Sequence, residues 1–159
     1  MAVRDLAIFG VNLQEIYNRL LANQDLCKLL YYTDKDPLSH EDFLDTQILL
    51  GNEIRIVPIV GEKIDAKTIM GMKILEGVPN ENSEFQDINL IFDIYLPLTQ
   101  WVIKGTNFRI FAIMSEIRKS LLNKSINGLG KLKGGRFKLE FMSPDIMCYT
   151  LHFVITDYV

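Results

Sequence analysis

The stretch Ile88-Asn89-Leu90-Ile91-Phe92-Asp93-Ile94-Tyr95-Leu96 carries the clearest structural signal in the chain. Its even-numbered residues are all apolar, whereas Asn89, Asp93 and Tyr95 interrupt the odd-numbered set. Side chains of a β-strand point alternately to two faces, so this spacing predicts a strand with one continuous apolar face.

Other strands are predicted on both sides of this stretch. Two near the end of the chain cover about residues 131–142 and 146–157, and the turn formers Ser143-Pro144-Asp145 separate them, which predicts an antiparallel hairpin. Upstream, residues 54–60 and 68–76 are further strand candidates. Pro58 cannot donate a ladder hydrogen bond, so it confines the first candidate to a sheet edge or to a strand end. An acidic loop rich in turn formers is expected from residue 77 to 87.

Apolar residues at helical spacing predict helices around these strands. The first stripe consists of Leu13, Ile16, Tyr17, Leu20 and Leu21, and it continues through Leu26, Leu29 and Leu30. A second long helix is expected over about residues 108–124, with Asn107 as its cap. A short helix is expected over about residues 40–50, begun by a capping box of Ser39 and Asp42.

The order of these elements predicts an α+β fold. We expect one domain, a two-layer sandwich in which two long amphipathic helices pack on a mainly antiparallel sheet; 159 residues suffice for its core. The net charge of −3 argues against a dedicated nucleic-acid-binding protein. The mean hydropathy of +0.13 is high, yet no run of about 18 apolar residues predicts a membrane span, and we expect no signal peptide. Cys27 and Cys148 are expected to be buried, reduced thiols.

The sequence predicts no enzyme, cofactor or metal site. His40 and His152 lack a Cys or His partner at the spacing of zinc ligands. The nucleotide-binding and hydrolase motifs are missing. Asp34 and Asp36 could form a carboxylate pair, but a turn stabilised by Asp side chains explains them more simply.

A basic, glycine-rich segment spans residues 128–136 and contains Lys131, Lys133 and Arg136. It follows a predicted helix and enters a predicted strand, which is the reverse of the order that directs amide groups at a phosphate. Two interpretations remain. The segment is a flexible loop with solvated cations, or it contacts a polyanion such as DNA.

Several segments then occur together in a recognisable order. They are Leu29-Leu30-Tyr31-Tyr32-Thr33-Asp34-Lys35-Asp36-Pro37-Leu38, a strand ending near Pro58, Asp87 to Ile94, Trp101, and Asn107-Phe108-Arg109. This combination resembles small neck and tail-completion proteins of bacteriophages that infect low-GC hosts. The order of the elements also resembles the tail-terminator fold.

The resemblance implies a structural role in the virion, without catalysis or a cofactor. Proteins of this kind form a ring, here expected to be a hexamer or a dodecamer, at the head-proximal end of the tail tube. The ring ends tube growth and joins the tail to the head connector, and DNA passes through its lumen without sequence-specific binding. The expected partners are copies of the chain itself, tail-tube proteins, head-connector proteins and DNA, with no membrane. The protein would be made in the host cytoplasm and end in the neck or tail of the virion.

The resemblance also suggests where contacts form. The expected interface residues are Tyr31, Tyr32, Asp34, Asp36, Pro37, Trp101 and Arg109. Arg109 lies at a helix start, where a cation is slightly disfavoured, so we expect it to pair with an acid. The acidic 77–87 loop is a further expected contact. Lys131, Lys133 and Arg136 are expected near the lumen or the DNA.

Three other functions stay open at this point. The chain could be another ring protein of the head–tail junction, such as a head-closure or connector protein. It could instead be a small α+β enzyme or ligand-binding domain, which would need a pocket with convergent polar groups. A cellular adaptor that uses apolar surface for one partner is the third.

Overall fold

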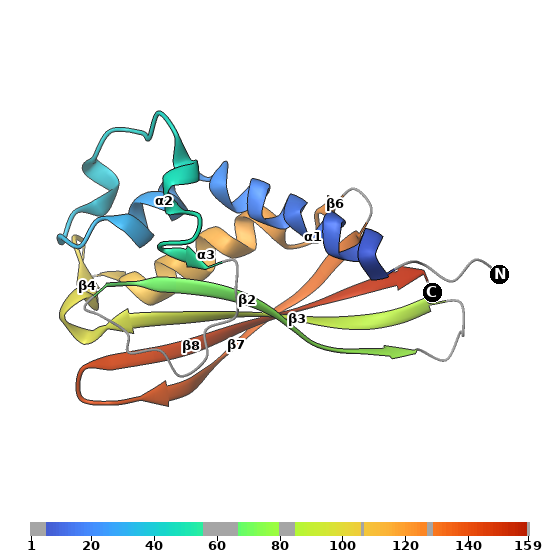
Figure 1. The fold of residues 1–159 in the computed structure, drawn as a ribbon. Coiled ribbons are helices and arrows are strands. Elements are labelled where there is room, and N and C mark those ends of the chain that lie inside the picture. Colours follow the sequence, from blue (N-terminus) through green and yellow to red (C-terminus); the bar gives the residue numbers. More distant parts are fainter. Residues whose placement is uncertain (1–5, 56–66, 80–84, 106, 127–128, 159) are drawn as a thin grey trace.

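The computed structural model describes the chain except for residues 1–5, 56–66, 80–84, 106, 127–128 and 159. A six-stranded sheet and three α-helices make up most of the described residues, and the helices lie over one face of the sheet (Figure 1). The prediction of an α+β fold with a mainly antiparallel sheet is confirmed. The helical residues are divided among three helices, where two long ones were expected.

The sheet has the strand order β1-β2-β3-β8-β7-β6. In that order the strands are β1 (Ile54–Arg55), β2 (Ile69–Pro79), β3 (Phe85–Pro97), β8 (Ile146–Tyr158), β7 (Gly130–Met142) and β6 (Ser125–Ile126). Neighbouring strands are antiparallel except β1 and β2, which are parallel. The two central strands, β3 and β8, pair along their whole length.

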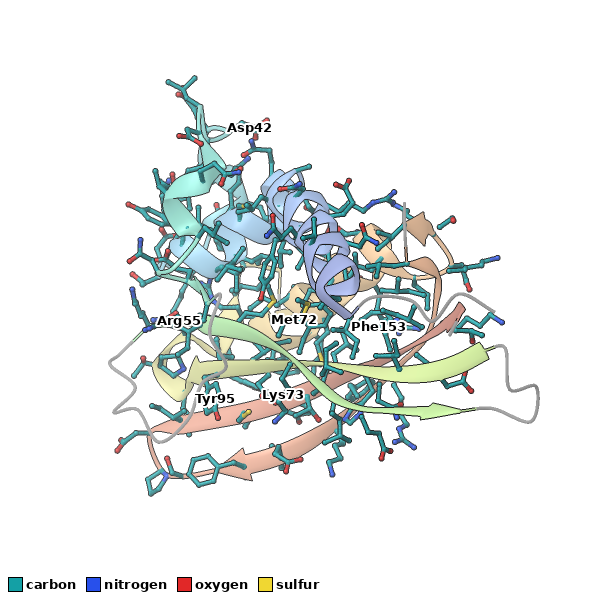
Figure 2. The ribbon with its side chains drawn as sticks, turned by 45° about the vertical axis from the view of Figure 1, so that its right-hand side comes forward. Asp42, Arg55, Met72, Lys73, Tyr95 and Phe153 are labelled. Atoms are coloured by element: carbon teal, nitrogen blue, oxygen red, sulfur yellow. The ribbon has the colours of Figure 1, made fainter. Side chains whose placement is uncertain are left out.

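The alternation along β3 divides its side chains between two faces, as predicted. The core residues of β3 are Ile88, Leu90, Phe92, Ile94 and Leu96. Met72 and Phe153 lie on this same side, below the helices, whereas Lys73 and Tyr95 lie on the other side of the sheet (Figure 2). We call these sides the helix face and the far face.

The first predicted helix forms as two helices, α1 (Leu6–Leu21) and α2 (Gln24–Tyr31). The break falls at Asn23, whose side-chain oxygen accepts a hydrogen bond of 3.0 Å from the backbone N–H of Leu26. An Asn cap of this kind satisfies one of the free amide groups at a helix start. The apolar stripe therefore continues across the break, although the backbone begins a new helix there.

The second predicted helix forms as α3 (Arg109–Leu121), and its start needs a correction. Asn107 does not cap it: the cap position is Phe108, and no side chain bonds to the helix start there. Asn107 instead belongs to β5 (Asn107–Phe108), which pairs with β4 (Val102–Ile103) in a separate two-stranded sheet.

The prediction of a helix over residues 40–50 is wrong. The segment after α2 contains two 3-10 helices, η1 (Pro37–Ser39) and η2 (Thr46–Leu49). The apolar residues here do not form one buried stripe, since Leu49 is buried while Leu44 is fully exposed.

The expected capping box at the start of that helix is also absent. Ser39 Oγ donates to the carbonyl oxygen of Asp36 at 2.8 Å, and Asp42 forms an ion pair of 2.6 Å with Lys28. Both side chains therefore stabilise the loop instead of a helix start.

The facing ends of β2 and β3 differ from those expected. The strands β2 and β3 extend to Pro79 and from Phe85, so most of the expected 77–87 loop is strand, and residues 80–84 lie outside the described chain. Of the expected strand 54–60 only β1 is described, and Pro58 lies outside the description. The strand β3 ends at Pro97, where η3 (Leu98–Gln100) follows.

The C-terminal hairpin is confirmed. Ser143 closes the turn between β7 and β8: its N–H donates to the carbonyl oxygen of Ile146 at 2.8 Å, and its Oγ accepts from the N–H of Ile146 at 3.1 Å. The strand β7 begins at Gly130, so the segment expected as a basic loop is mostly strand.

Candidate functional site

Arg109 is the largest fully buried side chain among the described residues. Its guanidinium donates hydrogen bonds to the backbone carbonyl oxygens of Gln100 at 3.1 Å, Leu29 at 2.7 Å, Tyr32 at 2.8 Å and Asp34 at 2.5 Å. Burial lowers the pKa of Arg109, and the charge of Asp34 opposes that effect. The expected ion pair with an acidic side chain is thus replaced by contacts with main-chain oxygens.

These bonds join three segments to the start of α3. They hold the end of α2, the loop that follows it and the end of η3 around one side chain. Carbonyl groups buried without a partner are costly, so Arg109 determines the conformation of this loop. The loop of residues 31–38, where contacts with other proteins are expected and which we call the interface loop, is therefore anchored from inside the molecule.

The two carboxylates of this loop have separate partners. Asp34 contacts His40 Nε2 at 2.7 Å and accepts from the N–H of Asp36 at 2.8 Å, which is the turn geometry expected from the sequence. Asp36 forms an ion pair of 3.1 Å with Lys104. The hydrogen bond to His40 lowers the pKa of Asp34 the most, and the bond from the N–H of Asp36 lowers it further. Both groups therefore act as anionic acceptors that fix the loop.

Aromatic rings surround the same loop. Tyr32 stacks on His40 with 3.7 Å between the ring centroids and 9° between the planes, and Tyr31 meets both Tyr32 and Phe43 edge to face. Tyr31 is exposed, whereas Pro37 is buried. Of the expected interface residues, Tyr31 and Asp34 are thus accessible on this loop, while Pro37 and Arg109 shape it from below.

Trp101 is also an expected interface residue. It belongs to a row of aromatic rings in contact, which we call the aromatic ledge. Its members are Trp101, Phe108, Phe111, Phe137 and Tyr149, with neighbouring ring centroids 5.4 to 6.3 Å apart. Three of them are exposed, Phe108, Phe111 and Phe137. No short-range pattern marks these three residues as a surface, because the rings come together only through tertiary contacts.

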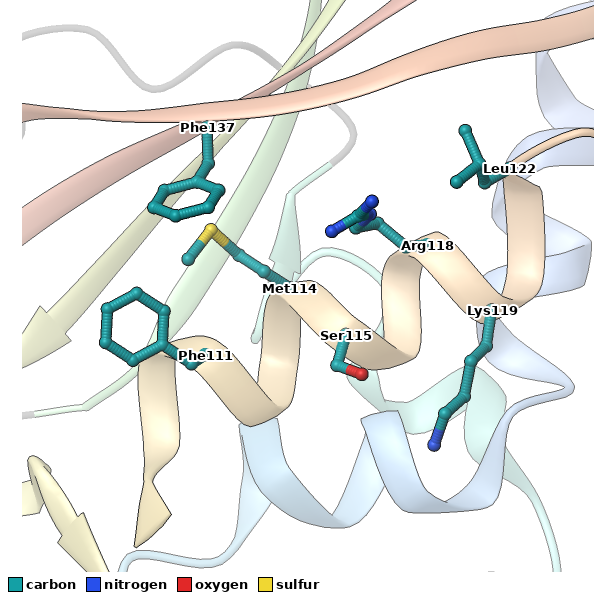
Figure 3. Close-up of a pocket in the computed structure, with 7 residues that line it drawn as sticks. All are labelled: Phe111, Met114, Ser115, Arg118, Lys119, Leu122 and Phe137. Carbon is teal, nitrogen blue, oxygen red and sulfur yellow. The ribbon is translucent and has the colours of Figure 1, made fainter.

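A groove of about 440 Å³ runs between α3 and β7, at one end of the ledge. Phe137 and Phe111 point toward each other across it, Met114 lies between them, and Arg118 stands farther along α3 (Figure 3). The lining is apolar at the Phe137 end and cationic at the Arg118 end. Such a groove suits an apolar side chain that is accompanied by an acid.

A second groove, of about 370 Å³, lies at the opposite edge of the sheet. Its walls are α1, with Leu13 and Tyr17, and β2, with Met72 and Ile74. Ile74 and its neighbour Leu75 are exposed. Both long edge strands therefore have an apolar groove between themselves and a helix.

The residues expected near DNA lie on β7 and are exposed. Lys133 is paired in register with Val154 and Arg136 with His152, both on the far face of β8. Lys131 is two positions from Lys133 along the same strand, so the strand alternation places it on the same side. The three cations thus form a line on the side of β7 that faces away from the helices.

The described residues contain no group of His, Cys, Asp and Glu side chains that could hold a metal ion, and none of their helices is long and apolar enough to cross a membrane. Both cysteines are free and buried, as predicted. Burial raises the pKa of Cys27 to about 11 and that of Cys148 to about 12, so neither is a reactive thiolate at neutral pH.

Comparison with solved structures finds a similar fold in a chain from the virion of a native gene transfer agent particle. The two chains are 12% identical and superpose with a TM-score of 0.53, over 91% of this chain and 92% of the virion chain. No curated protein sequence matches this one. The model of the YomW family matches residues 23–153, which include the interface loop, the aromatic ledge and nearly all of the sheet. The chain belongs to the YomW family, which is derived from phages.

Proposed function

We propose that this chain is a structural protein of a phage-type virion and has no catalytic role. The observation that carries the proposal is the fold that it shares with a component of a gene transfer agent virion over nearly the full length of both chains. Membership of a phage-derived family supports the same assignment.

Within the virion we propose the position of a tail terminator. Copies of the chain close into a ring, hexameric or dodecameric, which ends the tail tube and joins it to the head connector. The exposed apolar surfaces support an assembling subunit, since monomeric proteins rarely keep such surfaces in contact with water. In this arrangement Tyr31, Asp34 and the aromatic ledge face neighbouring proteins. Arg109 and Pro37 hold the contact loop in shape.

The line of cations on β7 is the side that we assign to DNA. Lys131, Lys133 and Arg136 are exposed side by side on one strand, which suits contact with a phosphate backbone that carries no sequence information. The overall charge of −3 keeps such contact weak, so that DNA can pass.

Deletion of the gene, with complementation, tests the proposal. A terminator mutant is expected to make DNA-filled heads that are separate from tails, with tails of uncontrolled length. Tails of normal length beside heads that lose their DNA would instead identify a head-closure or connector protein. Normal infectious particles would contradict a virion role and favour an enzyme or an adaptor.

A further inference from the structure

We propose that copies of this chain join edge to edge, with β7 of one copy pairing with β2 of the next. This inference rests on the proposed function, because a closed ring needs two different surfaces on each subunit. It names those surfaces, which are the two outer edges of the sheet.

Among the described residues, both edges have backbone without a strand partner along much of their length. Within the described chain, β6 pairs with β7 only at Gly130 and Lys131, so the outer edge of β7 has no strand partner from Lys133 to Met142. At the other edge, the described residues of β1 pair with β2 at Met70 and Gly71, and no described strand pairs with the outer edge of β2 beyond Gly71. Long edge strands are templates for pairing with another chain, and the only proline within β2 and β7 is Pro79 at the end of β2.

The strand directions allow the two edges to pair. Each of the pairs β2–β3, β3–β8 and β8–β7 is antiparallel, so β2 and β7 run in opposite directions. A copy placed beside the first by rotation about an axis along the strands would therefore present its β2 antiparallel to β7. The sheet would then continue from subunit to subunit without a change of pattern.

On the helix face, each edge of the sheet has an exposed apolar side chain and an apolar groove. Phe137 lines the groove of its own chain, whereas Leu139 is exposed beside it on β7; in the proposed joint, the groove between α1 and β2 receives Leu139. Ile74 protrudes at the β2 edge, and the groove between α3 and β7 can receive it. Continuation of the sheet brings each protruding residue beside the opposite groove, because all three side chains lie on the same face.

On the far face, Glu76 at the β2 edge and Arg136 at the β7 edge have opposite charges, while Lys73 of β2 is already paired with Asp93. Glu76 of β2 is in register with Asn89, and Arg136 of β7 is in register with His152, so both charged side chains project on that face. In the proposed joint, Arg136 pairs with Glu76 of the neighbouring copy, and Lys131 and Lys133 are the cations of this strand that stay directed at the DNA. A two-fold pair of β7 edges would not bring Glu76 to Arg136, because Glu76 lies on β2.

Crosslinking of two singly substituted proteins tests the joint. Leu75→Cys and Phe137→Cys, both at exposed positions, are mixed and treated with a short bis-maleimide, while the native cysteines are buried. We expect a 75–137 product in the mixture and little product from either variant alone. Leu44→Cys mixed with Phe137→Cys is the control, because Leu44 is fully exposed but lies in the loop before η2.

Three results would overturn the joint. They are a dominant 137–137 product, equal reaction with the Leu44→Cys control, and no 75–137 product at concentrations where the mass of the wild-type protein shows a discrete oligomer. The last result would leave the ring proposal standing and place its interface elsewhere. If the wild-type protein stays monomeric and the mixed variants give no 75–137 product, the joint is also contradicted. The gene deletion tests the virion role independently of this result.

Charge reversal provides a second test. Glu76→Arg and Arg136→Glu should each weaken self-association by about tenfold or more, and the double variant should recover most of the loss. Equal and additive losses in the double variant would show that these two residues do not meet across the joint. Circular dichroism of each variant checks that the fold is retained.

Discussion

The Nη1 of Arg109 donates a hydrogen bond of 2.7 Å to the carbonyl oxygen of Leu29, and so joins the start of α3 to α2 across 80 positions of sequence. Three further carbonyl groups share this guanidinium. The interface loop therefore depends on one buried cation, which leads to the first prediction.

Arg109→Met should lower the free energy of unfolding by about 3–5 kcal/mol, since several buried carbonyl groups would lose a charged donor at once. Urea unfolding followed by circular dichroism measures the change. Arg118→Met, an exposed substitution on the same helix, is the control and should change stability by less than about 0.5 kcal/mol. Equal losses in the two variants would contradict the role of Arg109.

Phe92→Asp should abolish folding, because Phe92 is buried at the centre of the sheet and the new carboxylate would have no partner there. Asn89→Lys, on the far face of the same strand and close to Glu76, should be tolerated. Soluble yield and the thermal unfolding transition distinguish the two variants. A folded Phe92→Asp protein would show that the assignment of the faces of β3 is wrong.

The parts of the fold that depend on local pattern could be predicted from the sequence. The alternation from Ile88 to Leu96, the turn at Ser143 and the helical stripe from Leu13 to Leu30 each require only short-range rules, and the structure contains all three. The helix expected over residues 40–50 failed because its capping residues have tertiary partners, such as Lys28 for Asp42.

The surfaces could not be predicted in the same way. Arg109 binds main-chain oxygens 9 to 80 positions away, and carbonyl acceptors leave no sequence signal. Phe111 and Phe137 meet only after the hairpin packs beside α3. Exposure of a helical phenylalanine depends on where the helix meets the sheet, which the spacing of apolar residues alone does not determine.

His152 should titrate below the usual histidine pKa. Burial lowers its pKa, and the nearby charges of Arg136 and Lys138 lower it further. The unfolded state then binds the proton more readily, so this group's contribution to stability is complete above about pH 6.5 and is lost as the pH falls below that value. Proton NMR measures the pKa directly. Arg136→Gln should raise it, and an unchanged value would contradict a positive field on this side of β7.

The cations of β7 should make DNA contact salt-dependent. Lys131→Gln with Lys133→Gln is expected to weaken binding to duplex DNA of any sequence, and to reduce the salt slope of the logarithm of affinity by about one for each lysine removed. Lys124→Gln, between α3 and β6 and opposite Leu132 of β7, is the control and should have little effect, because Lys124 is not part of the line of cations on β7. Fluorescence anisotropy at several salt concentrations provides the slopes. A similar loss of DNA affinity in the Lys124→Gln control would contradict the assignment of β7 as the DNA-contacting strand.

The copy number of the chain in purified particles tests the central claim most directly. Particles are washed at high salt, and the chain is counted against the major tail-tube and portal proteins by quantitative mass spectrometry with labelled peptides. A ring at the junction of head and tail predicts six or twelve copies per particle. Absence of the chain from washed, infectious particles would contradict a structural role in the virion.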